Sequence, residues 1–349
     1  MNIIKNNKYK RNYSVVSLFL VFMFLILTGC GSHQEQIKTE REVFAMDTIM
    51  NLTFYGEQGK TVMDLAIKEI NRLESLFSVT KEKSDIARIN AAAGNAVTVE
   101  SETYELIRQC QLYGDETEGF FDISIYPVVK LWGFTTEQYH VPSDTERNKA
   151  LENVDYKKIE LLPDHRIRIA KGMAIDLGAV VKGYLSQRIM EMCKEQGVES
   201  VIVSLGGNVQ ALGVKPEGEP YVVGITDPKD GISIYGTLQV QDQAVITSGI
   251  YQRYFDEDGK RYHHIMDKRT GMPAENDLAS VTVITEKGDR ADALATALYV
   301  MGEEKAKEYQ KKHPKIQLIL IRKDGTYWQS EGAKMKRHSD NGTSSTAPI

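Results

Sequence analysis

Short apolar β-strand patterns dominate the second half of the sequence, and they restrict the possible folds most strongly. From residue 201 onward the runs are VIVSLGG, YVVGIT, SIYGTLQV, AVITSG, SVTVIT and IQLILI. Two helical patterns, at 289–301 and 303–312, separate the last pair. Successive strands without crossover helices favour antiparallel pairing over a regular alternation of strand and helix. The sequence therefore predicts an α+β fold with mixed or antiparallel sheets and packed helices.

The first half supplies most of the expected helices. Apolar residues at helical spacing predict a helix over 61–77, a second starting at Ser101 and a third from near Asp176 to Gly197. The runs 43–56 and 165–172 alternate as strands do. The sequence has neither GxGxxG after a strand nor GxxxxGK[ST], so nothing indicates a classical dinucleotide fold or a P-loop.

The N-terminus has the pattern of an export signal. A basic start precedes the apolar run VVSLFLVFMFLIL, and LTGC then ends at Cys30. The run is shorter than a typical spanning helix, and its Leu-x-Gly-Cys ending resembles the bacterial lipoprotein signal, in which the Cys is lipidated. An uncleaved anchor is the alternative, and both interpretations place the folded part outside the cytoplasmic membrane. We expect, in order, a signal peptide (1–29), a polar tether (30–42), one folded domain (43–330) and a disordered tail (331–349).

Charge and cysteine content exclude some classes of function. The net charge of −5 gives no electrostatic reason to expect nucleic-acid binding. Cys110 and Cys193 lie in helical patterns without a CxxC spacing or a His cluster, so they do not indicate a metal site. We expect two buried small hydrophobes, although export would also permit a disulfide between them.

An oxygen-rich pair stands inside the apolar helical pattern GDRADALATALYVMG. Asp292 and Thr296 are four residues apart, so they lie on the same side of a helix. Their oxygens suit a hard cation such as Mg²⁺ or Ca²⁺ and not zinc or copper. The alternative is that Asp292 caps the helix and Thr296 bonds back to the carbonyl of residue 292.

Four further stretches offer candidate site residues, each with a structural alternative. GFFDISIYPVVKLWGF places two aromatic rings before Asp122, which could equally be a capping residue in a core strand. AIDLGAVVKGYL puts Asp176 at an expected helix start, with small residues and Lys182 beside it. In SLGGNVQALG the Gly-Gly pair exposes backbone N–H groups or simply forms a hairpin turn. In the last stretch, Thr247 to Gly249 are expected to form a polar turn, and His264 precedes Asp267.

Together these stretches resemble the ApbE-type FAD:protein FMN transferases, the flavin transferase family. The matching blocks occur in family order over roughly 43–325: AMDTIM, FS before SDIARIN, GFFDISIYPVVKLWGF, IDLGAVVKGY, SLGGNV, ITSGIYQRYF, HHIMDKRTGMP and ADALATAL. The resemblance implies a single α+β unit related to the T-fold, with a smaller subdomain packed against it.

The resemblance also implies an activity and a set of site residues. Members of the family cleave FAD as a substrate and attach FMN through a phosphoester to a Thr or Ser of a target protein, releasing AMP, and they require Mg²⁺. The family's metal ligands fall on the Ala179 carbonyl, Asp292 and Thr296. Its flavin-binding positions fall on Met46, Phe120, Phe121, Asp122, Asp176, Lys182 and Met266. His264 is the candidate base or phosphate contact, with Asp267 available to orient it.

On this basis we expect a magnesium-dependent transferase that flavinylates exported proteins and is lipid-anchored through Cys30 on the outer face of the cell membrane. One departure bears on the chemistry, because the family commonly has an aromatic residue near the position of Thr80. A threonine offers no stacking face and leaves room for water, which would hydrolyse FAD to FMN and AMP. A Mg²⁺-dependent FAD pyrophosphatase and a non-catalytic flavin-binding lipoprotein are therefore the alternatives.

Overall fold

A computed structural model describes residues 37–338 of the chain. The expected signal peptide and Cys30 lie outside the described residues, as does the sequence beyond 338. The described part combines antiparallel sheets with helices packed against them, so the predicted α+β class is confirmed. No helix within residues 37–338 has the length and hydropathy that crossing a membrane requires.

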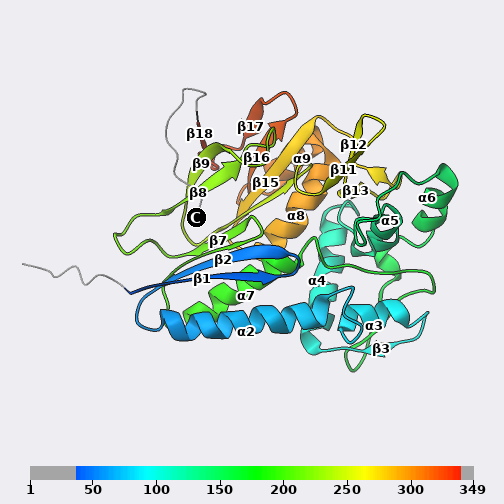
Figure 1. Cartoon of the computed structure of the whole chain (residues 1–349), viewed down its shortest axis with the longest axis horizontal. Helices are drawn as coiled ribbons and strands as arrows, with labels where there is room; N and C mark the ends of the chain where they lie inside the picture. The colour runs from blue at the N-terminus through cyan, green and yellow to red at the C-terminus, as the bar shows by residue number, and fades with distance from the viewer. Residues whose placement is uncertain (1–36, 339–349) are drawn as a thin grey trace, which may run out of the picture. The chain divides into compact units, whose positions relative to one another are not determined.

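An eight-stranded sheet forms the centre of this part (Figure 1). Each pair of neighbouring strands is antiparallel, as the strand-rich second half of the sequence predicts. In spatial order the strands are β1 (Lys38–Ala45), β2 (Thr48–Tyr55), β6 (Ser200–Leu205), β7 (Asn208–Leu212), β10 (Ala244–Gly249), β15 (Leu278–Thr285), β16 (Gln317–Arg322) and β17 (Tyr327–Gln329).

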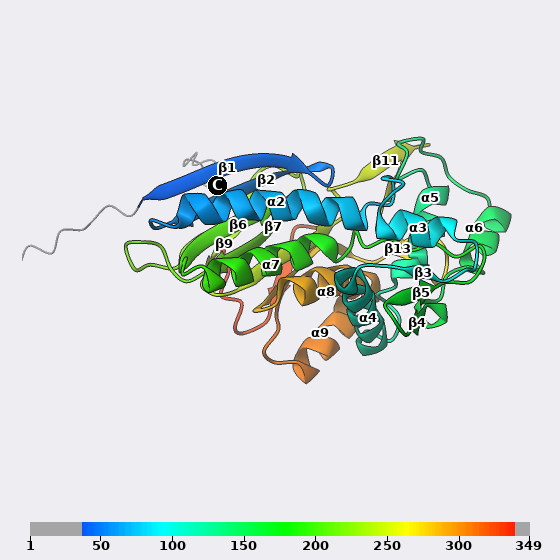
Figure 2. The same cartoon turned by 90° about the horizontal axis from the view of Figure 1, so that it is seen from below.

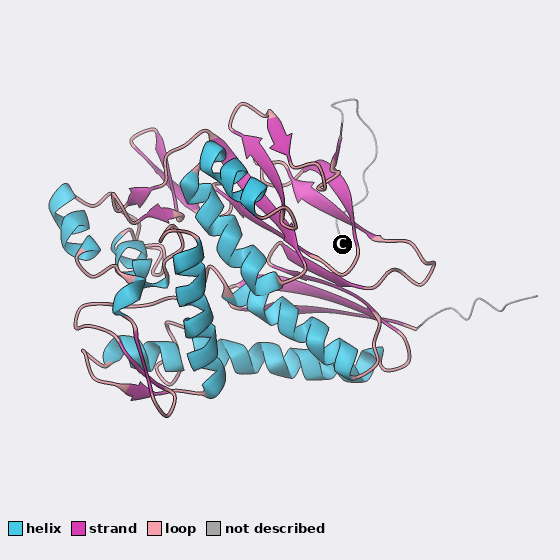
Figure 3. Cartoon of the chain, turned by 180° about the vertical axis from the view of Figure 1, so that it is seen from behind, coloured by secondary structure: helices cyan, strands magenta, loops and turns pink. Residues whose placement is uncertain are grey.

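Long helices cover one face of this sheet (Figure 3). They are α2 (Gly59–Phe77), α7 (Val181–Glu195), α8 (Gly288–Met301) and α9 (Glu303–Lys312). Apolar residues of α2 and α7 pack with the alternating inward residues of β2 and β6, such as Leu52 and Val203. The apolar stripe of α8 packs on β10, β15 and β16 in a second core. This packing fixes α7 and α8 beside one another, where their side chains can share a site.

A small sheet covers part of the opposite face. It consists of β8 (Tyr221–Thr226), β9 (Ile234–Val240) and β18 (Lys336–Arg337). Ala333 and Met335 are buried in the core between the two sheets. The expected disordered tail is therefore wrong over 331–338, because these residues carry apolar side chains that the small sheet buries.

The remaining elements form a lobe at one end of α2 (Figure 2). It contains helices, 3-10 segments, a three-stranded sheet and two hairpins. They are α3 (Asp85–Ala91), α4 (Ser101–Glu116), η1 (Ile123–Ile125), α5 (Tyr126–Leu131), α6 (Asp144–Leu151), η2 (Tyr156–Lys158), β3 (Val97–Thr98), β4 (Glu160–Leu162), β5 (Arg166–Arg168), β11 (Tyr254–Glu257), β12 (Lys260–His263), β13 (Met266–Asp267) and β14 (Met272–Pro273).

Three expected boundaries differ from the structure. The folded part begins before residue 43, because Lys38–Ala45 is strand β1, so the polar tether cannot extend to residue 42. Helix α7 begins at Val181 and not near Asp176. Thr247 to Gly249 belong to β10 and do not form a turn. Charged and polar residues misled the first and third predictions, since β1 exposes Lys38, Glu40, Arg41 and Glu42, and β10 carries Thr247 and Ser248.

Both cysteines of the described part are buried and unpaired. Cys110 lies on α4 and Cys193 on α7, in the same apolar core. Burial raises the pKa of both thiols, that of Cys193 to about 12. The prediction of two small hydrophobic side chains is confirmed, and the disulfide alternative is not.

Candidate functional site

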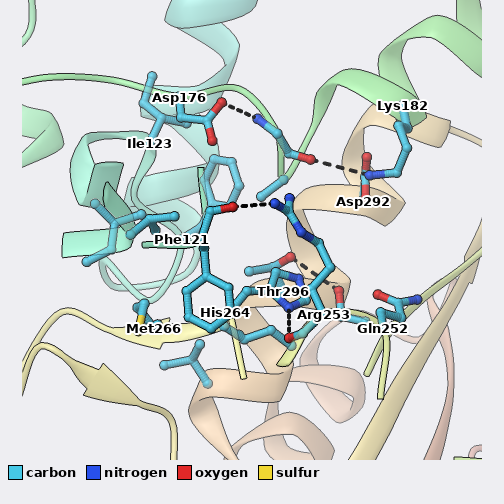
Figure 4. A pocket seen from close by; sticks show the side chains of 18 of the residues that line it. Phe121, Ile123, Asp176, Lys182, Gln252, Arg253, His264, Met266, Asp292 and Thr296 are labelled. Atoms are coloured by element: carbon cyan, nitrogen blue, oxygen red, sulfur yellow. Dashed lines mark hydrogen bonds between the residues drawn. The ribbon is translucent and has the colours of Figure 1, made fainter. Parts of the chain in front are cut away.

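A cavity of about 1170 Å³ lies where the sheet, α7, α8 and the lobe meet (Figure 4). Sites for drug-sized ligands occupy roughly 300–1,000 Å³, so this cavity has room for a ligand as large as a dinucleotide. Every predicted binding, metal and catalytic residue lines it. These residues are Met46, Phe120, Phe121, Asp122, Asp176, Ala179, Lys182, His264, Met266, Asp292 and Thr296. The structure thus brings together segments that lie far apart in the sequence, while the individual roles remain predictions.

Asp292 and Thr296 extend from α8 into the cavity. Asp292 Oδ2 accepts a hydrogen bond from the Gly183 backbone N–H at 2.9 Å, so the carboxylate satisfies a donor in the first turn of α7. Thr296 Oγ1 lies 3.2 Å from Ser248 Oγ. The alternative, that Asp292 caps its own helix and Thr296 bonds back along it, is wrong. Both side chains are directed away from α8, toward neighbouring elements.

The oxygen donors at this end of the cavity suit a divalent cation. Within residues 37–338, Asp292 Oδ1 forms no hydrogen bond, and Ala179 and Thr296 line the same cavity. The described residues contain no group of three His, Cys, Asp or Glu side chains that would hold a metal. A carboxylate, a hydroxyl and a carbonyl fit Mg²⁺, which usually retains waters and substrate oxygens in its shell.

The segment before α7 forms a loop and not the expected helix start. Asp176 Oδ1 accepts from the Gly178 N–H at 3.0 Å, and the Asp176 N–H donates to the Ile123 carbonyl at 2.9 Å. Burial raises the pKa of Asp176, while the positive charges of Arg253 and Lys182 oppose that shift. Lys182 lies in the first turn of α7, with Nζ 3.5 Å from the Gly178 carbonyl oxygen. Asp176 therefore organises a loop whose backbone faces the cavity.

The Phe120-Phe121-Asp122 run is only partly available to a ligand. Phe121 is 2% exposed and packs edge-on against Tyr113 in the core. Asp122 Oδ1 caps η1 by accepting from the Ser124 N–H at 2.9 Å, and Oδ2 pairs with Lys268 at 2.9 Å. Asp122 is therefore a capping residue, as the alternative expected, but it caps η1 and does not lie in a core strand. Its role in flavin binding stays a prediction.

Phe120 remains half-buried at the wall of the cavity. The Arg269 guanidinium lies 5.0 Å from its ring centroid and Lys305 Nζ lies 4.8 Å from it. Arg269 also lines the cavity, so it places positive charge beside an aromatic surface, which suits a ligand that joins rings to phosphates.

His264 follows β12 and is held by the backbone of Arg253. Its Nδ1 lies 3.1 Å from the Arg253 carbonyl oxygen. Because a carbonyl can only accept, Nδ1 carries the hydrogen and Nε2 keeps its lone pair. Burial, followed by the charge of Arg253, lowers the pKa of His264 to about 3. The imidazole is therefore neutral at physiological pH and available as a proton acceptor.

Asp267 does not orient His264, so that expectation is wrong. Its two carboxylate oxygens accept hydrogen bonds from Arg269 Nε at 2.9 Å and 3.0 Å. Arg269 is only two residues away, and its planar guanidinium matches a carboxylate better than an imidazole does. The backbone carbonyl of Arg253 takes the orienting role.

Three further side chains line the cavity and were not predicted as site residues. Arg253 donates to the Phe134 carbonyl and so joins the β11–β12 region to the loop after α5. Asn208, at the start of β7, is 3% exposed, and its Nδ2 has no partner within the described residues. Ser248 contacts Thr296. Each of them had a sequence signal. Asn208 directly follows Gly206-Gly207, which form a hairpin turn with φ of 60° and 89°, and Ser248 and Arg253 lie in the block ITSGIYQRYF.

Known proteins and solved structures resemble this chain over most of its length. The family model for the ApbE family matches residues 46–320. An FAD:protein FMN transferase from Treponema pallidum is 31% identical over 90% of this chain and 92% of its own length. One from Klebsiella pneumoniae is 34% identical over 73% of this chain and 80% of its own length. The crystal structure of the ApbE protein from Thermotoga maritima superposes with a TM-score of 0.80 at 32% identity, covering 84% of this chain and 97% of that one.

Proposed function

The chain belongs to the ApbE family. We propose that its cavity binds FAD and that the enzyme transfers the FMN half of FAD to an acceptor protein. The observation that carries this proposal is the lining of the cavity. It combines aromatic and apolar side chains, such as Phe120 and Met266, with the polar side chains of Lys182, Asp292 and Thr296. A flavin dinucleotide has the same division into rings and phosphates.

We propose that the acceptor is a Thr or Ser hydroxyl. Its oxygen forms a bond to the phosphorus of the FMN half, and the bond from that phosphorus to the bridging oxygen breaks. AMP leaves with the bridging oxygen, and the hydroxyl proton passes to a base. His264 is the proposed base because it lines the cavity and its bond to the Arg253 carbonyl leaves the Nε2 lone pair free.

Lys182 and a divalent cation would act on the phosphate side. We propose that Mg²⁺ is held by the Ala179 carbonyl, Asp292 and Thr296. When bound, the ion would offset the negative charge of the diphosphate. Lys182 adds a positive charge from the first turn of α7, where backbone N–H groups also favour anions.

We also propose that the enzyme is an exported lipoprotein. Residues 1–29 carry the signal pattern, and Cys30 ends the Leu-x-Gly-Cys motif. The acceptor would then be an exported flavoprotein, and the enzyme would be held at the outer face of the cell membrane through its lipid.

A second reaction, hydrolysis of FAD to FMN and AMP, is favoured by one observation. Thr80 lines the cavity, and its hydroxyl lies 3.0 Å from Ser78 Oγ. This small polar pair stands where the family commonly has an aromatic residue, so water has access to the same space.

Incubation of the protein with FAD, Mg²⁺ and a candidate acceptor domain separates these functions. An acceptor that stays yellow after denaturation, together with released AMP, supports FMN transfer. Free FMN and AMP with unmodified acceptor support the pyrophosphatase. Bound FAD without AMP release, even with acceptor present, supports a flavin-binding protein that performs no chemistry.

A further inference from the structure

Glu74 lies outside the cavity, yet it contacts two of the segments that form the cavity wall. The first is the turn between β1 and β2. Met46 and Asp47 form this turn with φ of 51° and 56°, and both line the cavity. A two-residue hairpin turn with positive φ at both positions is of type I′ and favours Asn-Gly. Met46 is unfavourable in this conformation, and Asp47 tolerates it less well than glycine would, so neighbouring contacts help to hold the turn in place.

Glu74 supplies one such contact from the last turn of α2. Its Oε1 accepts a hydrogen bond from the Met46 backbone N–H at 2.9 Å. The two residues are 28 positions apart in the sequence. The bond therefore anchors a strained turn to a long helix that is itself fixed by the core.

The second segment is the loop that follows α2. Glu74 Oε2 pairs with Lys81 Nζ at 2.5 Å. Ser78 Oγ accepts from the backbone N–H groups of Thr80 and Lys81 at 3.1 Å and 3.2 Å, which makes this loop compact. Thr80 is its cavity-lining member. The bond to Lys81, and then that to Met46, lower the pKa of Glu74, so the carboxylate is ionised at neutral pH.

We infer that Glu74 is a positioning residue for the flavin substrate. One carboxylate holds the Met46 turn and the Thr80 loop at a fixed separation, and that separation sets the affinity for FAD. Glu74 touches neither substrate nor reacting atoms, so it acts through Met46 and Lys81. This inference rests on the proposed use of the cavity for FAD.

Steady-state FMN transfer over a range of FAD concentrations tests the inference. Glu74→Ala removes both contacts, and we expect the KM for FAD to rise about tenfold with kcat within about twofold of wild type. Glu74→Gln keeps an oxygen for the Met46 N–H, and Lys81→Met leaves the bond to Met46 intact. Each should raise that KM by only about threefold. Asp64→Ala is the matched control, because it removes an exposed acidic side chain from the same helix.

A rescue experiment distinguishes positioning from a general loss of stability. Glycine adopts the conformation of residue 47 without strain, so in an Asp47→Gly background the effect of Glu74→Ala on the KM for FAD should shrink. The same effect in both backgrounds, or a KM unchanged by Glu74→Ala, would overturn the inference.

If Glu74→Ala does not fold, Glu74→Gln and Lys81→Met carry the test. Both remove the same ion pair, so the double variant should raise the KM no further than either single variant. Additive effects, or none, would contradict the inference. If the wild-type protein transfers FMN and these variants have the same KM for FAD, only this inference is overturned. If the wild-type protein does not transfer FMN, the proposed function is overturned.

Discussion

The carboxylate of Asp292 on α8 accepts a hydrogen bond from the backbone N–H of Gly183 on α7 at 2.9 Å. The contact is close because residue 183 has no side chain. A Cβ there would lie 2.2 Å from the Gly288 carbonyl oxygen and 2.7 Å from Asp292 Cβ. One side chain therefore joins two helices and presents its second oxygen to the cavity.

This arrangement predicts different effects for two substitutions of Asp292. Asp292→Asn keeps an oxygen for the Gly183 N–H but removes the charge, so FMN transfer should fall by about 100-fold or more while stability changes little. Asp292→Ala also leaves a buried N–H without a partner, which costs about 1–3 kcal/mol. Transfer rates and urea midpoints measure the two effects. Wild-type activity in Asp292→Asn would show that the charge has no role.

Lys182 is expected to act on the phosphates through its charge. Lys182→Met should lower kcat/KM for FMN transfer by roughly 10–100-fold, and Lys182→Arg should recover part of this loss. Lys194→Met is the control, because Lys194 is exposed on the last turn of the same helix. Equal rates for the two methionine variants would remove Lys182 from the mechanism.

Thr80 is expected to influence whether the FMN half of FAD is transferred to the acceptor or to water. Thr80→Tyr should fill space beside the substrate and raise the ratio of FMN transfer to free FMN formation. Thr80→Val, which keeps the size and removes the hydroxyl, should leave the ratio close to that of wild type. Chromatography of FMN and AMP, together with the yield of yellow acceptor, gives the ratio. A lower ratio in Thr80→Tyr would contradict this account of the loop.

Stability is expected to fall in mild acid because two histidines are buried in the neutral form. Burial lowers the pKa of His263 to about 4 and that of His264 to about 3. Unfolded histidine titrates near pH ~6.5, so the unfolded state binds these protons first as the pH falls. The free energy of unfolding should therefore decrease below pH ~6.5, by about 1.4 kcal/mol per pH unit for each histidine.

His263→Gln tests this pH dependence, since the variant has one titrating group fewer. Urea unfolding between pH 7 and pH 4.5 should give a shallower decline for the variant than for wild type. Parallel curves would show that His263 is not the cause.

The sequence predicts the site better than the elements that carry it. The spacing of Asp292 and Thr296 places both on one side of α8, because helical geometry alone decides this. The start of α7 could not be predicted from the sequence. An Asp before small residues is typical of a helix N-cap, but the Asp176 side chain accepts from Gly178 within a loop. Long-range contacts could not be predicted either, because nothing in the sequence indicates that the Glu74 carboxylate accepts from the Met46 N–H.

The roles of side chains that can bind more than one partner were predicted least well. Asp267 was expected beside His264, but Arg269 binds it in a local turn. Arg253 lies in the ITSGIYQRYF block, but nothing in the sequence predicts that its carbonyl fixes the His264 tautomer.

The decisive measurement is the intact mass of an acceptor protein after incubation with FAD and Mg²⁺. We expect one added FMN per acceptor, one AMP released for each FMN attached, and no adduct with Asp292→Asn. An acceptor of unchanged mass beside accumulating free FMN, or an unaltered adduct yield with Asp292→Asn, would show that the enzyme does not transfer FMN in this way.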